Sequence, residues 1–173
     1  LPPSTYCHEF GSNTAEQRLG GFRFEPLSVG VAQLASNLGG FGADHKALMA
    51  QLRHAAMALL LVPDAPSGRL AWTRGERGFA ASIEYTLTEE WTQRLRSGLR
   101  AVAEAYFEAG ALEVRPASDV FEPMHGRADL DRVASFPIRS GVTRLISAHV
   151  QGSCRMGPVP NGSVVDLEHQ VHG

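Results

Sequence analysis

Apolar and polar residues follow two different periods along this chain, and these periods predict its strands and helices. From residue 79 to residue 87 every second position is apolar, which indicates a strand with one face in the core. A shorter alternation at residues 22–25 predicts a strand that ends at Pro26, and the apolar run at 57–62 predicts a buried strand. Two further segments are expected to be extended, at residues 112–114 and 142–148.

Helical spacing is clearest from Trp91 to Tyr106, where apolar residues recur at intervals of three and four. The residues ahead of this stretch, Thr86-Leu87-Thr88-Glu89, match a capping box, in which a hydroxyl and a carboxylate bind backbone N–H groups at the start of a helix. Gly110 suits the left-handed position that follows a helix. The pattern therefore predicts one long amphipathic helix between these two signals.

A second helix is predicted to begin with Asp44 as its capping residue and to run to Ala56, with its apolar residues on one face. A helical turn is expected at residues 128–133. The first twenty residues and residues 119–127 are expected to be irregular. Because predicted strands adjoin strands instead of alternating with helices, the fold class expected for residues 1–173 is α+β, a mostly antiparallel sheet with helices on one face.

The aromatic residues are expected to belong to the core and not to clamp a substrate; they are Trp72, Trp91, Tyr106 and Phe107. Met124 and His125 lie in the irregular segment, where a solvated loop is the default interpretation and the lining of a substrate channel is the alternative.

Composition narrows the possible functions. The net charge is −2, with 16 basic and 18 acidic residues spread along the chain, and no basic stripe points to nucleic acid. The apolar run at 55–62 is too short to span a membrane. No targeting pattern is visible, so the cytoplasm is the default location. Cys7 and Cys154 are interpreted as two unpaired thiols.

The most specific pattern lies near the C-terminal end. It reads His149-x-x-Gly152-Ser153-Cys154-Arg155-Met156-Gly157, and it is followed by Ser163-Val164-Val165-Asp166 and by Val171-His172-Gly173. This run resembles the C-terminal signature of the glucose–methanol–choline (GMC) family of FAD-dependent alcohol oxidoreductases. Weaker likeness upstream is to the substrate-binding half of bacterial members, most similar to the branch that acts on longer-chain or sterol-like alcohols.

The resemblance implies a catalytic role for His149. In the family, the matching histidine takes or hydrogen-bonds the proton of the substrate hydroxyl while hydride passes from carbon to flavin. An unperturbed imidazole has a pKa of about 6.5, so it can accept a proton at neutral pH. The implied substrate is a small-molecule alcohol of apolar character, and the implied cofactor is FAD, which supplies the electron sink.

Two departures from the family pattern shape the expected organisation. No Gly-x-Gly-x-x-Gly follows a strand: Gly40-Phe41-Gly42-Ala43-Asp44-His45 has two of the glycines and lacks the third. The family's second catalytic residue, a histidine or asparagine, is expected beyond Gly173, because neither His169 nor His172 sits in its motif. We therefore expect residues 1–173 to be a substrate-binding portion that alone neither holds FAD well nor turns over, with residues 142–173 as its catalytic-motif segment.

Other chemistries fit the residues less well. Zinc ligands drawn from His149, Cys154, His169 and His172 match no standard spacing. A hydrolase that used Ser147 or Ser153 with His149 and Asp166 would lack a Gly-x-Ser-x-Gly turn, and Cys154 as a nucleophile leaves the signature without a role. The alternative from another class is a stand-alone, flavin-free binding or interaction domain with no redox activity.

Overall fold

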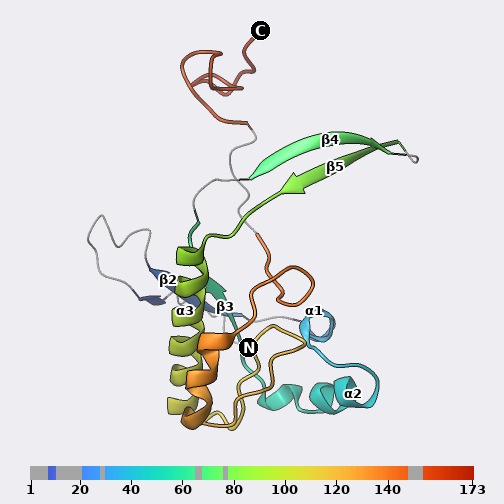
Figure 1. The fold of residues 1–173 in the computed structure, drawn as a ribbon, viewed down its shortest axis with the longest axis vertical. Helices are drawn as coiled ribbons and strands as arrows, with labels where there is room; N and C mark the ends of the chain where they lie inside the picture. Colours follow the sequence, from blue (N-terminus) through green and yellow to red (C-terminus); the bar gives the residue numbers. More distant parts are fainter. Residues whose placement is uncertain (1–7, 11–20, 28–29, 65–67, 76–77, 148–153) are drawn as a thin grey trace.

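The computed structural model describes residues 8–10, 21–27, 30–64, 68–75, 78–147 and 154–173. Its longest element is α3 (Glu89–Glu108), a helix of 20 residues that runs along the centre of the molecule (Figure 1). The apolar face predicted for this helix is confirmed, because Trp91, Leu95 and Val102 are buried. Gly110 follows the helix with a φ of 91°, as its position predicted.

The start of α3 differs from the prediction. Its N-cap is Thr88, whose side-chain oxygen accepts a hydrogen bond from the Trp91 N–H at 3.2 Å, so the capping box predicted at Thr86 is wrong. Hydroxyl residues stand at both positions, and the sequence pattern selected the earlier one because Glu89 follows it three residues later. Glu89 is instead the first residue of the helix.

One face of α3 contacts a three-stranded antiparallel sheet in the order β1-β2-β3, made of β1 (His8–Phe10), β2 (Phe22–Leu27) and β3 (Met57–Leu61). Gly98 of α3 allows this contact, because a Cβ there would lie 2.8 Å from Leu60 Cδ1 and 2.9 Å from Phe22 Cγ. The Trp91 indole N–H donates to the Val62 carbonyl at 3.2 Å and ties the end of β3 to the helix.

The strands of this sheet correct three expectations. β1 lies within the first twenty residues, which were expected to be irregular. β2 does not end at Pro26 but continues to Leu27, and Pro26 lies opposite Ala58 of β3, whereas β1 pairs with residues 22–24. β3 is present as predicted, although its residues are half-buried and not fully buried.

Two short helices precede β3. The helix α2 (Ala43–Ala50) confirms the predicted second helix, but it is shorter, and a 3₁₀ turn, η1 (Leu52–His54), continues it. Asp44 lies in the first turn of α2 and not at its cap, which is Gly42 with a φ of 60°. The helix α1 (Val31–Asn37) was not predicted; it has only seven residues, and none of them is buried.

The core lies where α3 meets η2 (Arg127–Ser135), a 3₁₀ helix that confirms and extends the helical turn predicted at 128–133. Ala103, Met124, Leu130 and Val133 are buried together, and the half-buried Phe107 packs against them. Met124 is fully buried, so the default interpretation of a solvated loop is wrong for this residue. Residues 112–114 form no strand, and Val114 instead makes an isolated antiparallel bridge to Met124.

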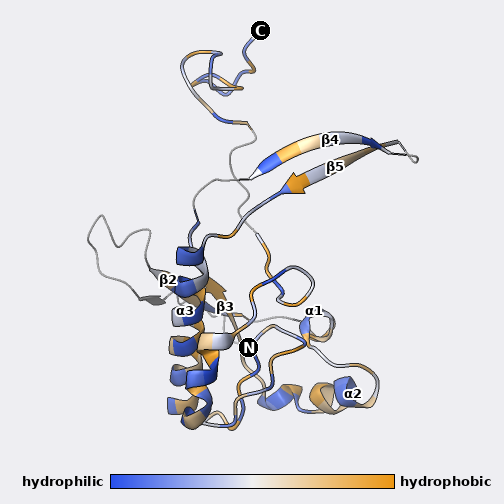
Figure 2. Cartoon of the chain, in the orientation of Figure 1, coloured by the Kyte–Doolittle hydropathy of each residue, from blue (hydrophilic) through white to orange (hydrophobic). Residues whose placement is uncertain are grey.

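A separate two-stranded antiparallel hairpin, β4 (Arg69–Gly75) and β5 (Gly78–Glu84), projects from the body (Figure 1). β5 confirms the strand predicted from residue 79, although β4 was not predicted and β5 ends before residue 87. The prediction that one face of this strand lies in the core is wrong, because Phe79 and Ile83 are 76% and 74% exposed. The expectation that Trp72 belongs to the core is wrong as well, since this residue of β4 is 71% exposed. Figure 2 shows apolar positions on both of these strands.

Helices and antiparallel strands in small sheets give the α+β fold class expected from the sequence. The strands form two sheets instead of one, and α3 covers the three-stranded sheet. Of the segment expected to be extended at 142–148, the described residues contain one isolated bridge, between Thr143 and Ser118, and no strand.

Candidate functional site

The predicted catalytic residue, His149, lies outside the described residues, as do Gly152 and Ser153. The structure describes what holds the chain on either side, up to Ser147 and again from Cys154. The geometry of these two flanks is therefore what the structure contributes to the candidate site.

On the N-terminal flank, Arg144 joins segments that are far apart in the sequence. Its backbone N–H donates to the Ala117 carbonyl at 2.9 Å, and its guanidinium Nη2 lies 2.8 Å from Asp119 Oδ1. Its Nη1 also donates to the carbonyl of Asn37, 107 residues earlier, at the end of α1. Gly39 makes room for this cluster, because a Cβ there would lie 2.8 Å from Asp119 Oδ1.

Sequence reasoning did not single out Arg144. Nothing local distinguishes it from the other arginines, since its partners become neighbours only through the fold. It lies five residues before His149 in the sequence, so it anchors the backbone that leads toward the predicted base.

On the C-terminal flank, the structure brings the three parts of the signature together. Met156 forms a parallel bridge with Val165, and Val165 forms an antiparallel bridge with Val171. Hydrogen bonds run from Gly157 N–H to the Val165 carbonyl at 2.9 Å and from Val164 N–H to the Arg155 carbonyl at 2.8 Å. The described residues of the signature, 154–173, therefore form one folded coil, which lies at the opposite end of the molecule from α2 (Figure 1).

Side chains also meet inside this coil. His172 Nε2 lies 2.9 Å from Ser163 Oγ and 3.2 Å from the Gly157 carbonyl oxygen. The Ser163 hydroxyl lies 3.3 Å from the same carbonyl and also donates to the carbonyl of Val159. A hydrogen bond from His172 to the Gly157 carbonyl, which only accepts, corresponds to the tautomer that carries a proton on Nε2.

The glycine of this cluster has a steric reason. A Cβ on Gly157 would lie 2.9 Å from Ser163 Cβ and 3.1 Å from Ser163 Oγ, closer than side-chain carbons normally approach. Gly157, Ser163 and His172 together are called the Gly157–Ser163–His172 cluster below.

Asp166 has a structural task in the same coil. Its Oδ1 accepts the backbone N–H groups of Glu168 at 3.0 Å and Gln170 at 2.8 Å, which closes a turn. His169 lies in this turn with a φ of 65°. The carboxylate is thus occupied by backbone donors, which disfavours the hydrolase arrangement that would use Asp166 to orient a histidine.

Among the described residues, no group of three or more His, Cys, Asp or Glu side chains is arranged to hold a metal ion. The zinc site considered from the sequence therefore gains no support from the placement of Cys154, His169 and His172. Its fourth residue, His149, lies outside the described residues. Cys154 is a free, exposed thiol. Cys7, the other cysteine, is also outside the described residues.

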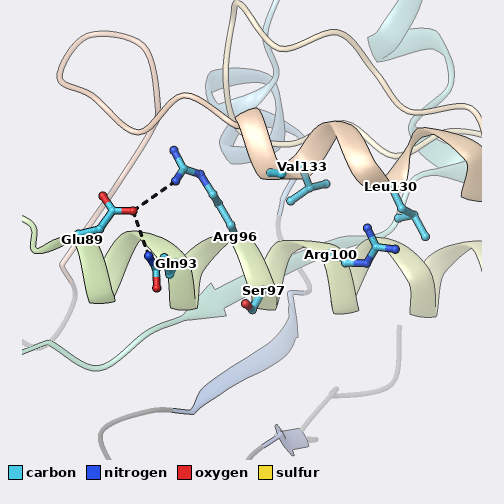
Figure 3. Close-up of a pocket in the computed structure, with 8 residues that line it drawn as sticks. Glu89, Gln93, Arg96, Ser97, Arg100, Leu130 and Val133 are labelled. Carbon is cyan, nitrogen blue, oxygen red and sulfur yellow. Dashed lines mark hydrogen bonds and ion pairs between the residues drawn. The ribbon is translucent and has the colours of Figure 1, made fainter.

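A groove of about 460 Å³ lies between α3 and η2 (Figure 3). Its guanidinium groups are already engaged: Arg96 donates to the Phe136 carbonyl and Arg100 lies 2.8 Å from Asp131. The Oε1 atom of Glu89 lies 3.3 Å from Gln93 Nε2 and 3.9 Å from Arg96 Nη1 (Figure 3). No described residue of the signature, from Cys154 to Gly173, lines this groove.

A smaller hollow of about 110 Å³ lies where β5 meets α3, beside Asp64, Tyr85 and Arg94. Among the described residues that line it, none belongs to the signature. The alternative that Met124 and His125 line a channel also lacks support, since Met124 is buried in the core and the His125 side chain is 66% exposed.

Comparison with known families decides the assignment. The family model described as GMC oxidoreductase matches residues 63–173, well over half of the chain. The chain belongs to the GMC oxidoreductase family. The match includes β4, β5, α3 and the whole signature, so the resemblance stated from the sequence is confirmed at the level of the family.

Comparisons of this GMC chain with curated proteins and with solved structures gave no significant match. In the part of the chain that the structure describes, no helix combines the length and apolar character needed to cross a membrane.

GMC oxidoreductases generally bind FAD. The described residues do not form a cradle for a dinucleotide: Gly40 and Gly42 connect α1 to α2, with no strand ahead of them, and Phe41 between them is 93% exposed. The segment from Gly40 to Gly42 is therefore not a dinucleotide-binding loop that follows a strand.

Proposed function

We propose that this GMC chain is the substrate-binding portion of an FAD-dependent alcohol oxidoreductase and that His149 is its base. The observation that carries the proposal is the family match over residues 63–173, which contains the complete signature beginning at His149. The two described flanks support it, because both are tied by several hydrogen bonds on either side of this histidine.

The chemistry divides between cofactor and protein. When bound, FAD supplies the acceptor for the hydride that leaves the carbinol carbon. The imidazole of His149 accepts the hydroxyl proton of the alcohol, which makes the carbon a better hydride donor. The protein also holds the alcohol in a reactive orientation, which removes most of the entropic cost of the encounter.

For the substrate, we propose an apolar alcohol of the longer-chain or sterol-like type, which rests on the likeness of the upstream segments to that branch. FAD is held mainly by residues outside these 173. A series of primary alcohols of increasing chain length, assayed with the full-length protein, tests the substrate. We expect kcat/KM to rise with chain length, whereas a preference for sugars or for the shortest alcohols would contradict the proposal.

The role of His149 is tested in the full-length flavoprotein by His149→Ala, with His54→Ala as the control. His54 is an exposed histidine of η1. We expect the rate of flavin reduction by alcohol to fall by about 10²–10⁴-fold in His149→Ala, the usual contribution of a positioned base, with flavin content unchanged. Wild-type reduction in His149→Ala would reject the proposal, and a full-length protein without flavin would favour a binding domain.

A further inference from the structure

The coil formed by residues 154–173 has almost no apolar core of its own. Its larger apolar side chains are exposed, among them Val159 at 54%, Leu167 at 60% and Val171 at 73%. Hydrophobic burial among these residues therefore contributes little to its order, and the hydrogen bonds inside it carry more of the stabilisation than they would in a packed domain.

Within this coil, His172 is bound in two ways. Its backbone N–H donates to the Val164 carbonyl at 3.1 Å, which joins the last residues of the chain to the Ser163–Asp166 part of the signature. Its imidazole Nε2 reaches the Gly157 carbonyl and the Ser163 hydroxyl. A single residue thus connects all three parts of the signature.

Gly157 shows that this contact is built into the sequence. The Cβ of an alanine at this position would press against Ser163 at 2.9 Å, so the cluster closes only with a glycine there. The half-buried setting of Gly157, Ser163 and His172, within a coil that is otherwise largely exposed, also shields these hydrogen bonds from competing water.

We infer that His172 is a positioning residue for the reaction proposed above. Through the Gly157 carbonyl and Ser163, it holds Arg155–Gly157 in place, and these residues follow His149 within the same signature. The inference rests on the proposed function. A base displaced by about 1 Å from its reactive geometry can lose on the order of 10²-fold in rate, so a loosened anchor on this flank lowers the rate of the chemical step.

The test uses the full-length flavoprotein with His172→Ala, His172→Gln and Ser163→Ala. Glutamine keeps an N–H donor near the position of Nε2. Ser163→Ala removes only a hydroxyl, so it still tests the cluster if His172→Ala disturbs folding. The control is His169→Asn, because His169 is an exposed histidine of the same coil and asparagine tolerates its positive φ.

Two readouts are needed. Hydrogen exchange followed by mass spectrometry reports on the peptides of residues 154–173, and anaerobic flavin reduction gives the limiting rate and the apparent KM for the alcohol. In His172→Ala we expect exchange in the coil to accelerate about tenfold or more and the limiting rate to fall about tenfold, with KM within about twofold. His172→Gln should restore part of both, Ser163→Ala should show the same changes at smaller size, and His169→Asn should match wild type.

The outcomes separate the two proposals. Wild-type exchange in His172→Ala would show that the cluster does not hold the coil, and faster exchange with a wild-type limiting rate would show a structural role alone; either result overturns the inference. Failure of the proposed function appears elsewhere, as wild-type flavin reduction in His149→Ala.

Discussion

Several glycines of this protein mark places where one more methyl group does not fit. Gly98 is the example in the body of the fold, where α3 approaches Leu60 of β3 and Phe22 of β2. Gly157 is the example in the signature, where the backbone approaches Ser163. Helix propensity alone would favour alanine over glycine at position 98 by about 1 kcal/mol, so steric packing and propensity make opposite predictions there.

We predict that packing decides at Gly98. Gly98→Ala should lower the free energy of unfolding by up to about 2 kcal/mol, because overpacking in a filled site typically costs about 1–3 kcal/mol and the gain in propensity offsets about 1 kcal/mol of it. The measurement is urea denaturation. Ser97→Ala, at the neighbouring exposed position of the same helix, is the control and should leave stability unchanged or slightly raise it; a stabilised Gly98→Ala protein would contradict the packing of α3 on the sheet.

A second residue-scale prediction concerns Asp129 in η2. Its Oδ2 accepts the His125 backbone N–H at 2.8 Å, and this hydrogen bond, with Arg132 nearby, lowers the pKa of the Asp129 carboxyl below its usual value. A pKa lowered by folding stabilises the folded state above the unfolded-state pKa, and that contribution is lost as pH falls through the folded-state pKa.

Asp129→Asn should therefore be less stable than wild type near neutral pH, and the difference should shrink as the pH becomes acidic. Thermal unfolding across a pH series gives the measurement. Asp131→Asn is the control, since Asp131 lies in the same 3₁₀ helix with a largely exposed side chain and pairs with Arg100 at the surface. A constant difference between Asp129→Asn and wild type at all pH values would contradict the role of the carboxylate charge.

At the scale of elements, the beginning of α3 shows how one helix start is selected from two candidates. Thr86 and Thr88 both precede the helix, and the structure uses Thr88. Thr88→Ala should cost about 0.5–2 kcal/mol of stability by leaving the Trp91 N–H without its capping acceptor, whereas Thr88→Ser should retain most of it. Equal stability of these two variants in urea denaturation would contradict the assigned cap.

The elements also show how far local patterns reach. The long helix, β3 and the strand at residue 79 were predictable, because spacing of three to four or of two is a property of neighbouring residues. The exposure of β5 was not predictable. Alternation predicts that a strand has an apolar face, but whether another element covers that face depends on the fold. α1 was not predicted because its seven residues are too few for an apolar spacing to repeat over several turns.

At the scale of the whole molecule, the family and the candidate base came from the sequence, and the anchoring of the site came from the structure. A signature of contiguous residue types is readable along the chain, so GMC membership was predictable from residues 149–173. Other contacts form only when the chain folds, and no local pattern predicts them. They are the contacts of Arg144 with Asn37 and Asp119 and the contact of His172 with Gly157.

We propose His149 as the base of a flavin-dependent alcohol oxidation, and one measurement tests this role most directly. Anaerobic stopped-flow reduction of the full-length flavoprotein by a saturating alcohol should be followed across pH for wild type and His149→Ala. We predict a wild-type rate that falls as pH drops and a His149→Ala rate that is about 10²–10⁴-fold lower and has lost that pH dependence. A His149→Ala protein with the wild-type rate and pH profile would contradict the account.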